Sequence, residues 1–280
     1  MDGMIYVTLA RWPDGLDENG QVELLVATTG LDPFTARQRV AHGIPGVLLR
    51  TDQTAGWDMI DKLDAAGAMA IGLSPTEIGA APEPRKAKRL MEAQGAPKPM
   101  YMVEFWREEA QALLCDDVFL LVRAKIDRSQ VRVRTGSPPG PGDFFSTSLS
   151  PGAAGAFALN LNWTPGTHTT TVKFTHIIDL YTRSGTRVRI DGDKFNFDVL
   201  GDQRGLTELE NVDKLALKLA GECKGAMVDT GFGDFRVSPE LARGVVHDLV
   251  GTTVIKRDEG PAFELYSVWS WHLHRRLMAR

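Results

Sequence analysis

The sequence predicts an α+β protein of two domains joined by a linker. Residues 1–73 contain the order strand, helix, helix, strand, helix, strand, with turn residues between the elements. Residues 74–99 are rich in proline, alanine and charged residues, a composition that is typical of a linker. Residues 100–280 contain many short apolar runs and fewer helical patterns, which predicts a mostly antiparallel sheet covered by helices.

The first domain begins with a strand at Met4–Leu9, a run rich in β-branched and aromatic residues. A short helix is expected from Val22 and ends at Gly30, because glycine accepts the left-handed conformation of a helix terminus. Asp32 can cap the next helix, with Pro33 at its first position. The remaining expected elements are a strand at Val47–Leu49, a helix over residues 57–67 and a closing strand at Met69–Leu73.

Three segments of this domain follow a recognisable pattern. They are Thr29-Gly30-Leu31 between the first two helices, Ala36 and Val40 in the second helix, and Leu63–Ala68 (Leu-Asp-Ala-Ala-Gly-Ala) before the last strand. In order and spacing they make residues 4–73 similar to the C-terminal domain of the bacterial ribosomal stalk protein. The resemblance implies the same β-α-α-β-α-β fold for about a quarter of the chain.

The first two helices differ from that family in charge. The stalk family presents Lys and Arg there to translation factors, whereas the matching positions here are Glu23, Val26 and Phe34, and only Arg37 is basic. Residues 1–73 carry five Lys or Arg and ten Asp or Glu, a net charge of −5. The domain is therefore expected to serve as a docking or packing module without binding translational GTPases.

Composition limits the classes of function. The chain has 280 residues, 43% hydrophobic content and a net charge of −4, which fits two domains with real cores and argues against a dedicated nucleic-acid binder. Cys115 and Cys223 lie far apart and form no metal or redox spacing, so reduced thiols in the cytoplasm are expected. No signal peptide or transmembrane segment is expected, nor any cofactor.

The expected linker contains a basic run, Arg85–Arg89. One interpretation is a contact with an acidic partner, RNA or a membrane surface. The alternative is a solvated helical segment within the tether.

The second domain, residues 100–280, is expected to be rich in strands. A hairpin is predicted at Ser184-Gly185, and a helix from Thr207. Further helical residues are expected after Ser238-Pro239, a helix that would include His247. The expected strands are Met100–Phe105, Val118–Ile126, Val131–Thr135, Phe157–Trp163, Thr169–Phe174, Ile177–Thr182, Arg187–Ile190, Phe195–Val199, Gly225–Asp229 and Ala262–Leu273.

This arrangement of antiparallel strands and one packing helix loosely resembles pleckstrin-homology-like barrels. The Gly- and Pro-rich segment Gly136–Gly155 lacks the ending of a phosphate-binding loop. A mobile surface loop is therefore predicted there.

The strongest candidate for metal chemistry is an acidic cluster, Asp191, Asp193 and Asp198, with Asp202 nearby. Carboxylates on adjacent turns can bind Mg²⁺ or Ca²⁺. A calcium loop starting at Asp191 would need Gly at its sixth position and Glu at its twelfth, where this chain has Asn196 and Asp202. Ordinary turn residues are the alternative interpretation.

Histidines and nucleophiles give weaker patterns. His272 and His274 would share one face of the last predicted strand, although no carboxylate or Cys completes a metal set at a recognisable spacing. No Gly-x-Ser-x-Gly occurs, and no catalytic residue is assigned. The other histidines considered are His168, His176 and His247.

The C-terminal end combines aromatic and basic residues, which suit either a contact surface or a core strand with solvated charges beyond it. These residues are Tyr266, Trp269, Trp271, Arg275 and Arg276.

Three functions remain open from the sequence. The first is a non-enzymatic adaptor or regulatory protein that binds an unknown protein partner, with the acidic first domain docking it. The second is a metal-assisted hydrolase using the three-Asp cluster. The third is a peripheral membrane binder that uses the basic run at residues 85–89.

Overall fold

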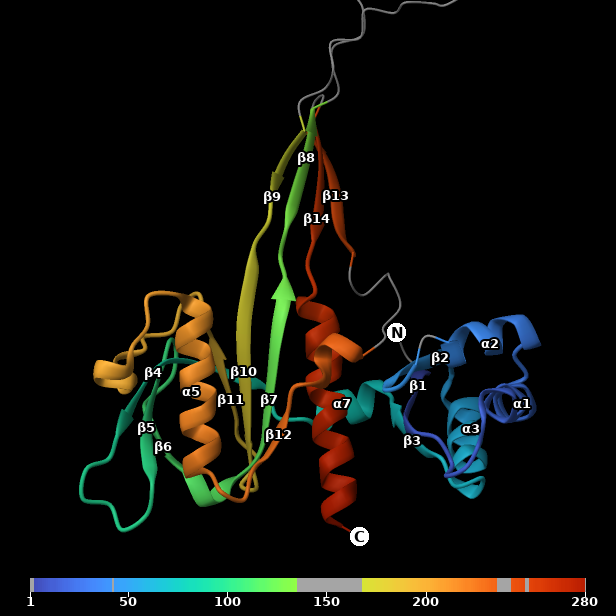
Figure 1. Cartoon of the computed structure of the whole chain (residues 1–280), viewed down its shortest axis with the longest axis horizontal. Coiled ribbons are helices and arrows are strands. Elements are labelled where there is room, and N and C mark those ends of the chain that lie inside the picture. The colour runs from blue at the N-terminus through green and yellow to red at the C-terminus, as the bar shows by residue number, and fades with distance from the viewer. Residues whose placement is uncertain (1–2, 42, 135–167, 236–242, 250–251, 280) are drawn as a thin grey trace, which may run out of the picture.

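The computed structural model describes residues 3–41, 43–134, 168–235, 243–249 and 252–279. Figure 1 shows a small N-terminal unit beside a larger body, from which a narrow sheet extends. The sheets have three, seven and four strands. The predicted α+β class is confirmed.

The N-terminal unit has the predicted element order, and its sheet is antiparallel in the order β2-β1-β3. Gly30 ends the first helix at a φ of 70°, and the Asp32 carboxylate accepts hydrogen bonds from the first turn of the second helix. The core centres on Ile5, Leu25 and Leu63, which are fully buried. The elements are β1 (Met4–Arg11), α1 (Glu18–Thr29), α2 (Pro33–Ala41), β2 (Gly46–Asp52), α3 (Gln53–Ala65) and β3 (Met69–Leu73).

The prediction that residues 74–99 form a linker is wrong for most of that segment. The chain forms α4 (Pro75–Ala80) and then β4 (Pro84–Glu92), and β4 lies inside the seven-stranded sheet between β11 and β5. The basic run is therefore part of a strand and not a solvated helix. The sequence did not indicate a strand because only Ala87 and Leu90 of β4 are buried in the core.

The seven-stranded sheet has the order β12-β7-β10-β11-β4-β5-β6. It is mostly antiparallel, as predicted, and only the pairs β11·β4 and β12·β7 are parallel. The remaining strands are β5 (Met100–Phe105), β6 (Gln111–Leu114), β7 (Val118–Asp127), β10 (Phe174–Thr182), β11 (Arg187–Asp191) and β12 (Met227–Asp229).

One helix covers each face of this sheet. On β10, Ile178 packs in the core under α5 (Glu208–Glu222), and its neighbour Ile177 packs in the core under α7 (Gly260–Met278). Alternating side chains of one strand thus enter two different cores. Short 3₁₀ turns fill the connections at Cys115–Asp117, Asp198–Gln203 and Gly231–Asp234.

A four-stranded sheet in the order β13-β14-β8-β9 extends from the body (Figure 1). Its strands are β8 (Gln130–Arg134), β9 (His168–Thr171), β13 (Arg243–Leu249) and β14 (Thr252–Arg257). His247 therefore lies on a strand and not on the predicted helix. The expected loop Gly136–Gly155, the strand Phe157–Trp163 and the helix start Ser238-Pro239 lie outside the described residues.

The predicted strand Ala262–Leu273 is wrong, since these residues belong to α7. The side chains of this helix are buried on almost all sides. Its apolar residues therefore fit the two-residue period of a strand as well as the period of a helix. Pro261 fits the start of the helix, where no backbone donor is needed. The expected strand Phe195–Val199 is likewise absent, and only Asn196 forms an isolated bridge, to Arg89.

Helix α7 also joins the two parts of the protein. The Arg276 guanidinium pairs with Asp64 and donates to the Ala70 carbonyl oxygen at 2.6 Å. Trp269 and Trp271 are buried, so the aromatic and basic C-terminal end is chiefly a packing surface. Among the described helices, none combines the length and apolar character needed to cross a membrane.

Candidate functional site

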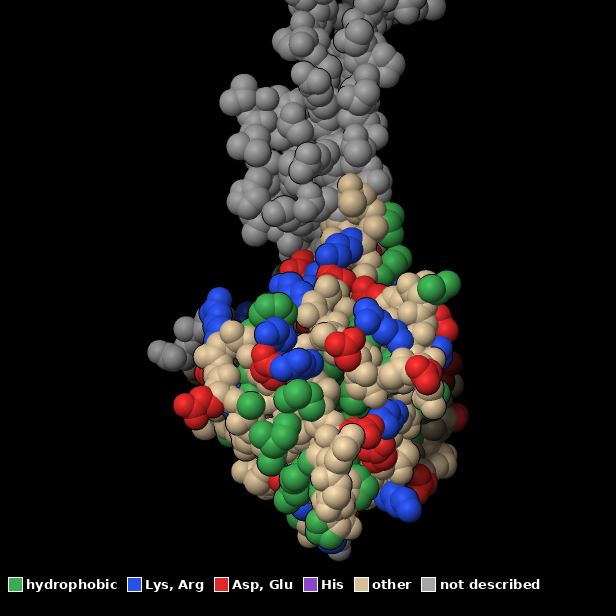
Figure 2. Space-filling view, turned by 90° about the vertical axis from the view of Figure 1, so that its left-hand side faces the viewer, with side chains coloured by type: hydrophobic (Ala, Val, Ile, Leu, Met, Phe, Trp, Pro, Cys, Tyr) green, Lys and Arg blue, Asp and Glu red, His purple; other side chains and the backbone are tan. Residues whose placement is uncertain are grey.

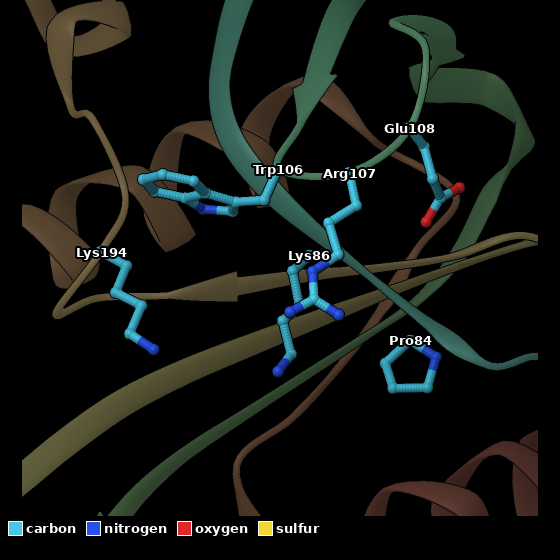
Figure 3. Close-up of a pocket in the computed structure, with 6 residues that line it drawn as sticks. All are labelled: Pro84, Lys86, Trp106, Arg107, Glu108 and Lys194. Atoms are coloured by element: carbon cyan, nitrogen blue, oxygen red, sulfur yellow. The ribbon is translucent and has the colours of Figure 1, made fainter.

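A pocket of about 590 Å³ opens on the seven-stranded sheet and is the candidate functional site. Three segments that are distant in sequence supply its walls (Figure 3). Strand β4 gives one cation, the loop after β5 gives a tryptophan and an arginine, and the turn after β11 gives a lysine. The lining residues are Pro84, Lys86, Trp106, Arg107, Glu108 and Lys194.

The strand pairings place these side chains. Ala87 points into the core beneath α5, so the preceding residue, Lys86, points to the opposite face of the sheet. The Trp106 backbone N–H donates to the Lys86 carbonyl oxygen at 3.1 Å, which holds the loop beside β4. Lys194 lies in a tight turn in which its N–H and that of the buried Phe195 donate to the Asp191 carbonyl oxygen.

The pocket carries positive charge that carboxylates in the described part of the chain do not neutralise. Lys86, Arg107 and Lys194 are exposed, and no carboxylate in the described parts of the chain forms an ion pair with them. The carboxylate of Glu108 pairs with Arg85 instead. Figure 3 shows Arg107 and Lys86 directed into the same part of the pocket, whereas Glu108 points away.

Neighbouring cations on β4 differ from Lys86 in this respect. The Lys88 ammonium lies 2.6 Å from Glu104, and Arg89 pairs with the same carboxylate. Figure 2 shows the side of the molecule where β4, β5 and β6 lie, and its Lys and Arg side chains are interspersed with Asp and Glu. On this side of the molecule the basic side chains are thus mixed with acidic ones and do not form a broad basic surface.

An exposed indole completes the site. Trp106 is 52% exposed, which is unusual for the largest apolar side chain. A flat aromatic ring beside cations can pack against an apolar or planar part of a ligand while the cations hold its anionic part.

A network of buried charged residues lies on the face of the sheet to which Lys86 points, opposite α5. Asp179 of β10 is fully buried and accepts hydrogen bonds from Arg187 and Arg189 of β11, each with a shortest distance of 2.7 Å. Burial raises the pKa of Asp179, but the two guanidinium groups outweigh it and hold that pKa well below its usual range. Glu264 of α7 pairs with both arginines, and the Ser267 hydroxyl donates to Asp179 at 2.6 Å. With its charges balanced, the network serves to fasten α7 to the sheet.

The three Asp residues considered for a metal are not brought together. Asp191 lies 3.7 Å from the Arg128 guanidinium, Asp193 pairs with Lys173, and Asp198 lies 3.1 Å from Arg204. Each has its own cation, as is typical of turn residues. The described part of the chain contains no group of three or more His, Cys, Asp or Glu side chains arranged to hold a metal ion.

The described histidines occupy separate places. His176 Nδ1 lies 3.2 Å from Glu208 at the start of α5. His272 contacts the Glu77 carbonyl oxygen at 2.9 Å, and burial lowers its pKa, whereas His274 contacts the Ser270 carbonyl oxygen of its own helix. The prediction that His272 and His274 share a face is wrong, because residues two apart on a helix point in different directions.

The two cysteines are closer than their spacing suggests. Cys115 and Cys223 are both fully buried in the core beneath α5. A hydrogen bond with Cys115 and burial raise the pKa of Cys223 far above its usual value. The structure thus places in one core two thiols that lie far apart in the sequence.

Only part of the pocket could be predicted from the sequence. Lys86 belongs to the basic run that we singled out, but Trp106, Arg107 and Lys194 carried no motif. The usable signal was a Trp-Arg pair directly after the strand Met100–Phe105, since loops at strand ends commonly carry functional side chains.

Comparisons with known proteins identify no relative: no family model, curated protein or solved structure matches this chain. The stalk-like identity of residues 4–73 and the pleckstrin-homology-like architecture therefore stay predictions.

Proposed function

We propose that this chain is a non-enzymatic adaptor or regulatory protein that binds an acidic segment of a partner protein in the basic pocket. The observation that carries the proposal is a single pocket lined by Lys86, Arg107 and Lys194, which form no ion pair within the described residues. Like charges held together without a counter-charge repel each other. An acidic ligand relieves that repulsion, which gives binding energy and specificity.

Other features fit this proposal. The pocket volume lies within the range of sites that hold a side chain or small ligand. The Asp residues of the alternative hydrolase are each paired with a different cation. The reduced, buried thiols fit a cytoplasmic protein.

A direct test uses a fluorescein-labelled hexaglutamate peptide and its hexaglutamine counterpart in fluorescence anisotropy. We expect the glutamate peptide to bind and the glutamine peptide not to bind, with weaker binding at higher salt because exposed charges are screened. The double variant Lys86→Glu/Lys194→Glu should lose at least about tenfold in affinity, or ~1.4 kcal/mol.

The matched control is Lys62→Glu/Lys98→Glu, which makes the same change in net charge at two exposed lysines outside the pocket. It should bind the glutamate peptide as the wild type does. Equal losses in the two double variants would show a response to net charge and contradict a pocket. Equal binding of both peptides to the wild type would contradict recognition of acidic groups.

A further inference from the structure

We infer that the acidic group recognised by the basic pocket is a phosphoryl group on a side chain of the partner peptide. This inference rests on the proposed function and specifies its ligand. The observations behind it are the number of cations, the separate segments that supply them and the exposed indole beside them.

The number and origin of the cations favour a phosphoryl group. Lys86, Arg107 and Lys194 come from a strand, a loop and a turn and all line the pocket. Figure 3 shows Arg107 and Lys86 close together and Lys194 apart from them. A carboxylate offers two oxygens in one plane and a single charge. A phosphoryl group offers three strong acceptor oxygens and a charge of about −1.5 to −2 at neutral pH. A pocket lined by three cations from separate segments matches the phosphoryl group better.

Two carboxylates near the pocket form ion pairs with other cations. Glu104 satisfies both Lys88 and Arg89, and Glu108 borders the pocket yet pairs with Arg85 outside it. Glu108 thus lines the pocket but forms no ion pair with its three cations. Arg107 supplies the planar fork that matches phosphate oxygens in pairs, and the two lysines act as point charges.

The indole indicates what carries the phosphoryl group. Trp106 is exposed at the rim of the same pocket, where it can stack on a ring attached to the phosphate. Phosphotyrosine combines both features in one side chain. We therefore expect a preference for phosphotyrosine over phosphoserine, and this preference should depend on Trp106.

The test titrates the full-length protein with four labelled peptides that share one Gly- and Ser-rich sequence and differ at the central residue: phosphotyrosine, phosphoserine, glutamate or tyrosine. We expect the phosphotyrosine peptide to bind at least about tenfold more tightly than the glutamate peptide, as for an additional charge-assisted hydrogen bond. Its binding should strengthen between about pH 5 and pH 7.5, where the phosphate loses its second proton. A glutamate peptide, already ionised at pH 5, should show no such gain.

Variants connect this preference to the pocket. Arg107→Lys keeps the charge but removes the fork, so it should reduce the preference for phosphotyrosine over glutamate several-fold. Trp106→Ala should reduce phosphotyrosine binding more than phosphoserine binding. Lys98→Gln, outside the pocket, is the control and should change neither. Because the substituted side chains are exposed, the melting temperatures of the variants should equal that of the wild type.

Three outcomes would overturn the inference. Equal binding of the glutamate and phosphotyrosine peptides would reject the phosphoryl group while leaving the proposed function in place. Absence of binding by all four peptides would reject the phosphoryl group, and it would also reject the proposed function only if the hexaglutamate peptide failed to bind as well. Binding of ADP, or of vesicles that contain a phosphoinositide, about tenfold more tightly than the phosphotyrosine peptide would assign the phosphate to a nucleotide or a lipid instead of a protein.

Discussion

Replacing Asp179 with asparagine should strongly destabilise the protein, because this carboxylate neutralises two buried guanidinium groups. Asp179 is fully buried and Arg187 is 1% exposed. In the variant Asp179→Asn, only the partly exposed Glu264 would remain to balance Arg187 and Arg189. Breaking a buried ion pair by removing one partner costs on the order of 3–5 kcal/mol. That is a large fraction of the ~5–15 kcal/mol by which proteins are commonly stable.

The loss should be visible in thermal and urea unfolding. At about 2–4 °C per kcal/mol for chains in this range of size, the melting temperature should fall on the order of 10 °C at pH 7. The control is Asp198→Asn, whose exposed pair with Arg204 should contribute less than about 1 kcal/mol. A variant Asp179→Asn within about 1 kcal/mol of the wild type would refute the assignment of Asp179 as the anchor of α7.

The pH dependence provides a second readout of the same group. The folded-state pKa of Asp179 is held below its unfolded value. Its ionised form is therefore stabilised by folding, and this contribution is fully present above the unfolded pKa of about 3.9. It is lost as the pH falls through the folded pKa. The wild type should lose stability between about pH 4 and pH 2 more steeply than Asp179→Asn, which lacks the titrating group.

Three further expectations concern other parts of the chain. Mg²⁺ or Ca²⁺ should not raise the melting temperature. A bound metal would add about 2.7 kcal/mol to the free energy of unfolding at a hundredfold excess over its Kd, so a shift that Asp193→Asn abolishes would contradict the turn interpretation. Residues 1–73 should unfold cooperatively as an isolated fragment, since they have a core of their own; a fragment without a cooperative melt would reject this unit. Gly56→Ala should lower the free energy of unfolding by about 1–3 kcal/mol in urea, because its Cβ would collide with the buried Ile5 side chain. The control, Gly221→Ala in α5, places its Cβ in open space and should be neutral or stabilising by up to about 1 kcal/mol. A neutral Gly56→Ala would contradict the packing of Gly56 against Ile5.

Local signals predicted the parts of the fold that depend on local chemistry. Gly30 and Asp32 marked the helix boundaries of the first unit because the backbone conformations there favour those residue types. Thr207 marked the start of α5 in the same way, by accepting a hydrogen bond from Glu210. These contacts lie within a few residues of each other in the chain, so the sequence reports them directly.

Tertiary context decided the elements that were predicted wrongly. Strand β4 resembled a charged linker in the sequence. Three of its four cations, Arg85, Lys88 and Arg89, form ion pairs with carboxylates on β5 or in the loop after β5, and the sequence alone does not reveal such partners. Helix α7 is buried on nearly all sides between the large sheet and β3, so its apolar pattern did not distinguish helix from strand.

Prediction of the candidate site would also have required knowledge of contacts between distant parts of the chain. Lys86, Arg107 and Lys194 are separated by about 20 and about 90 residues, and only the pairing of β4 with β5 and β11 brings them together. Conversely, Asp191 and Asp193 are neighbours in sequence, but their carboxylates pair with different cations. Proximity in sequence therefore pointed to a metal cluster, whereas strand pairing produced a basic pocket.

The most direct test of the basic pocket is a titration of the isotope-labelled protein with the hexaglutamate peptide, followed by amide and indole chemical shifts. We predict that the largest changes fall at the Trp106 indole N–H and at the backbone amides of residues 85–86, 106–108 and 194, and that Lys86→Glu/Lys194→Glu removes them. Changes centred on another surface, or no changes at peptide concentrations well above that of the protein, would contradict the assignment of this pocket as the binding site.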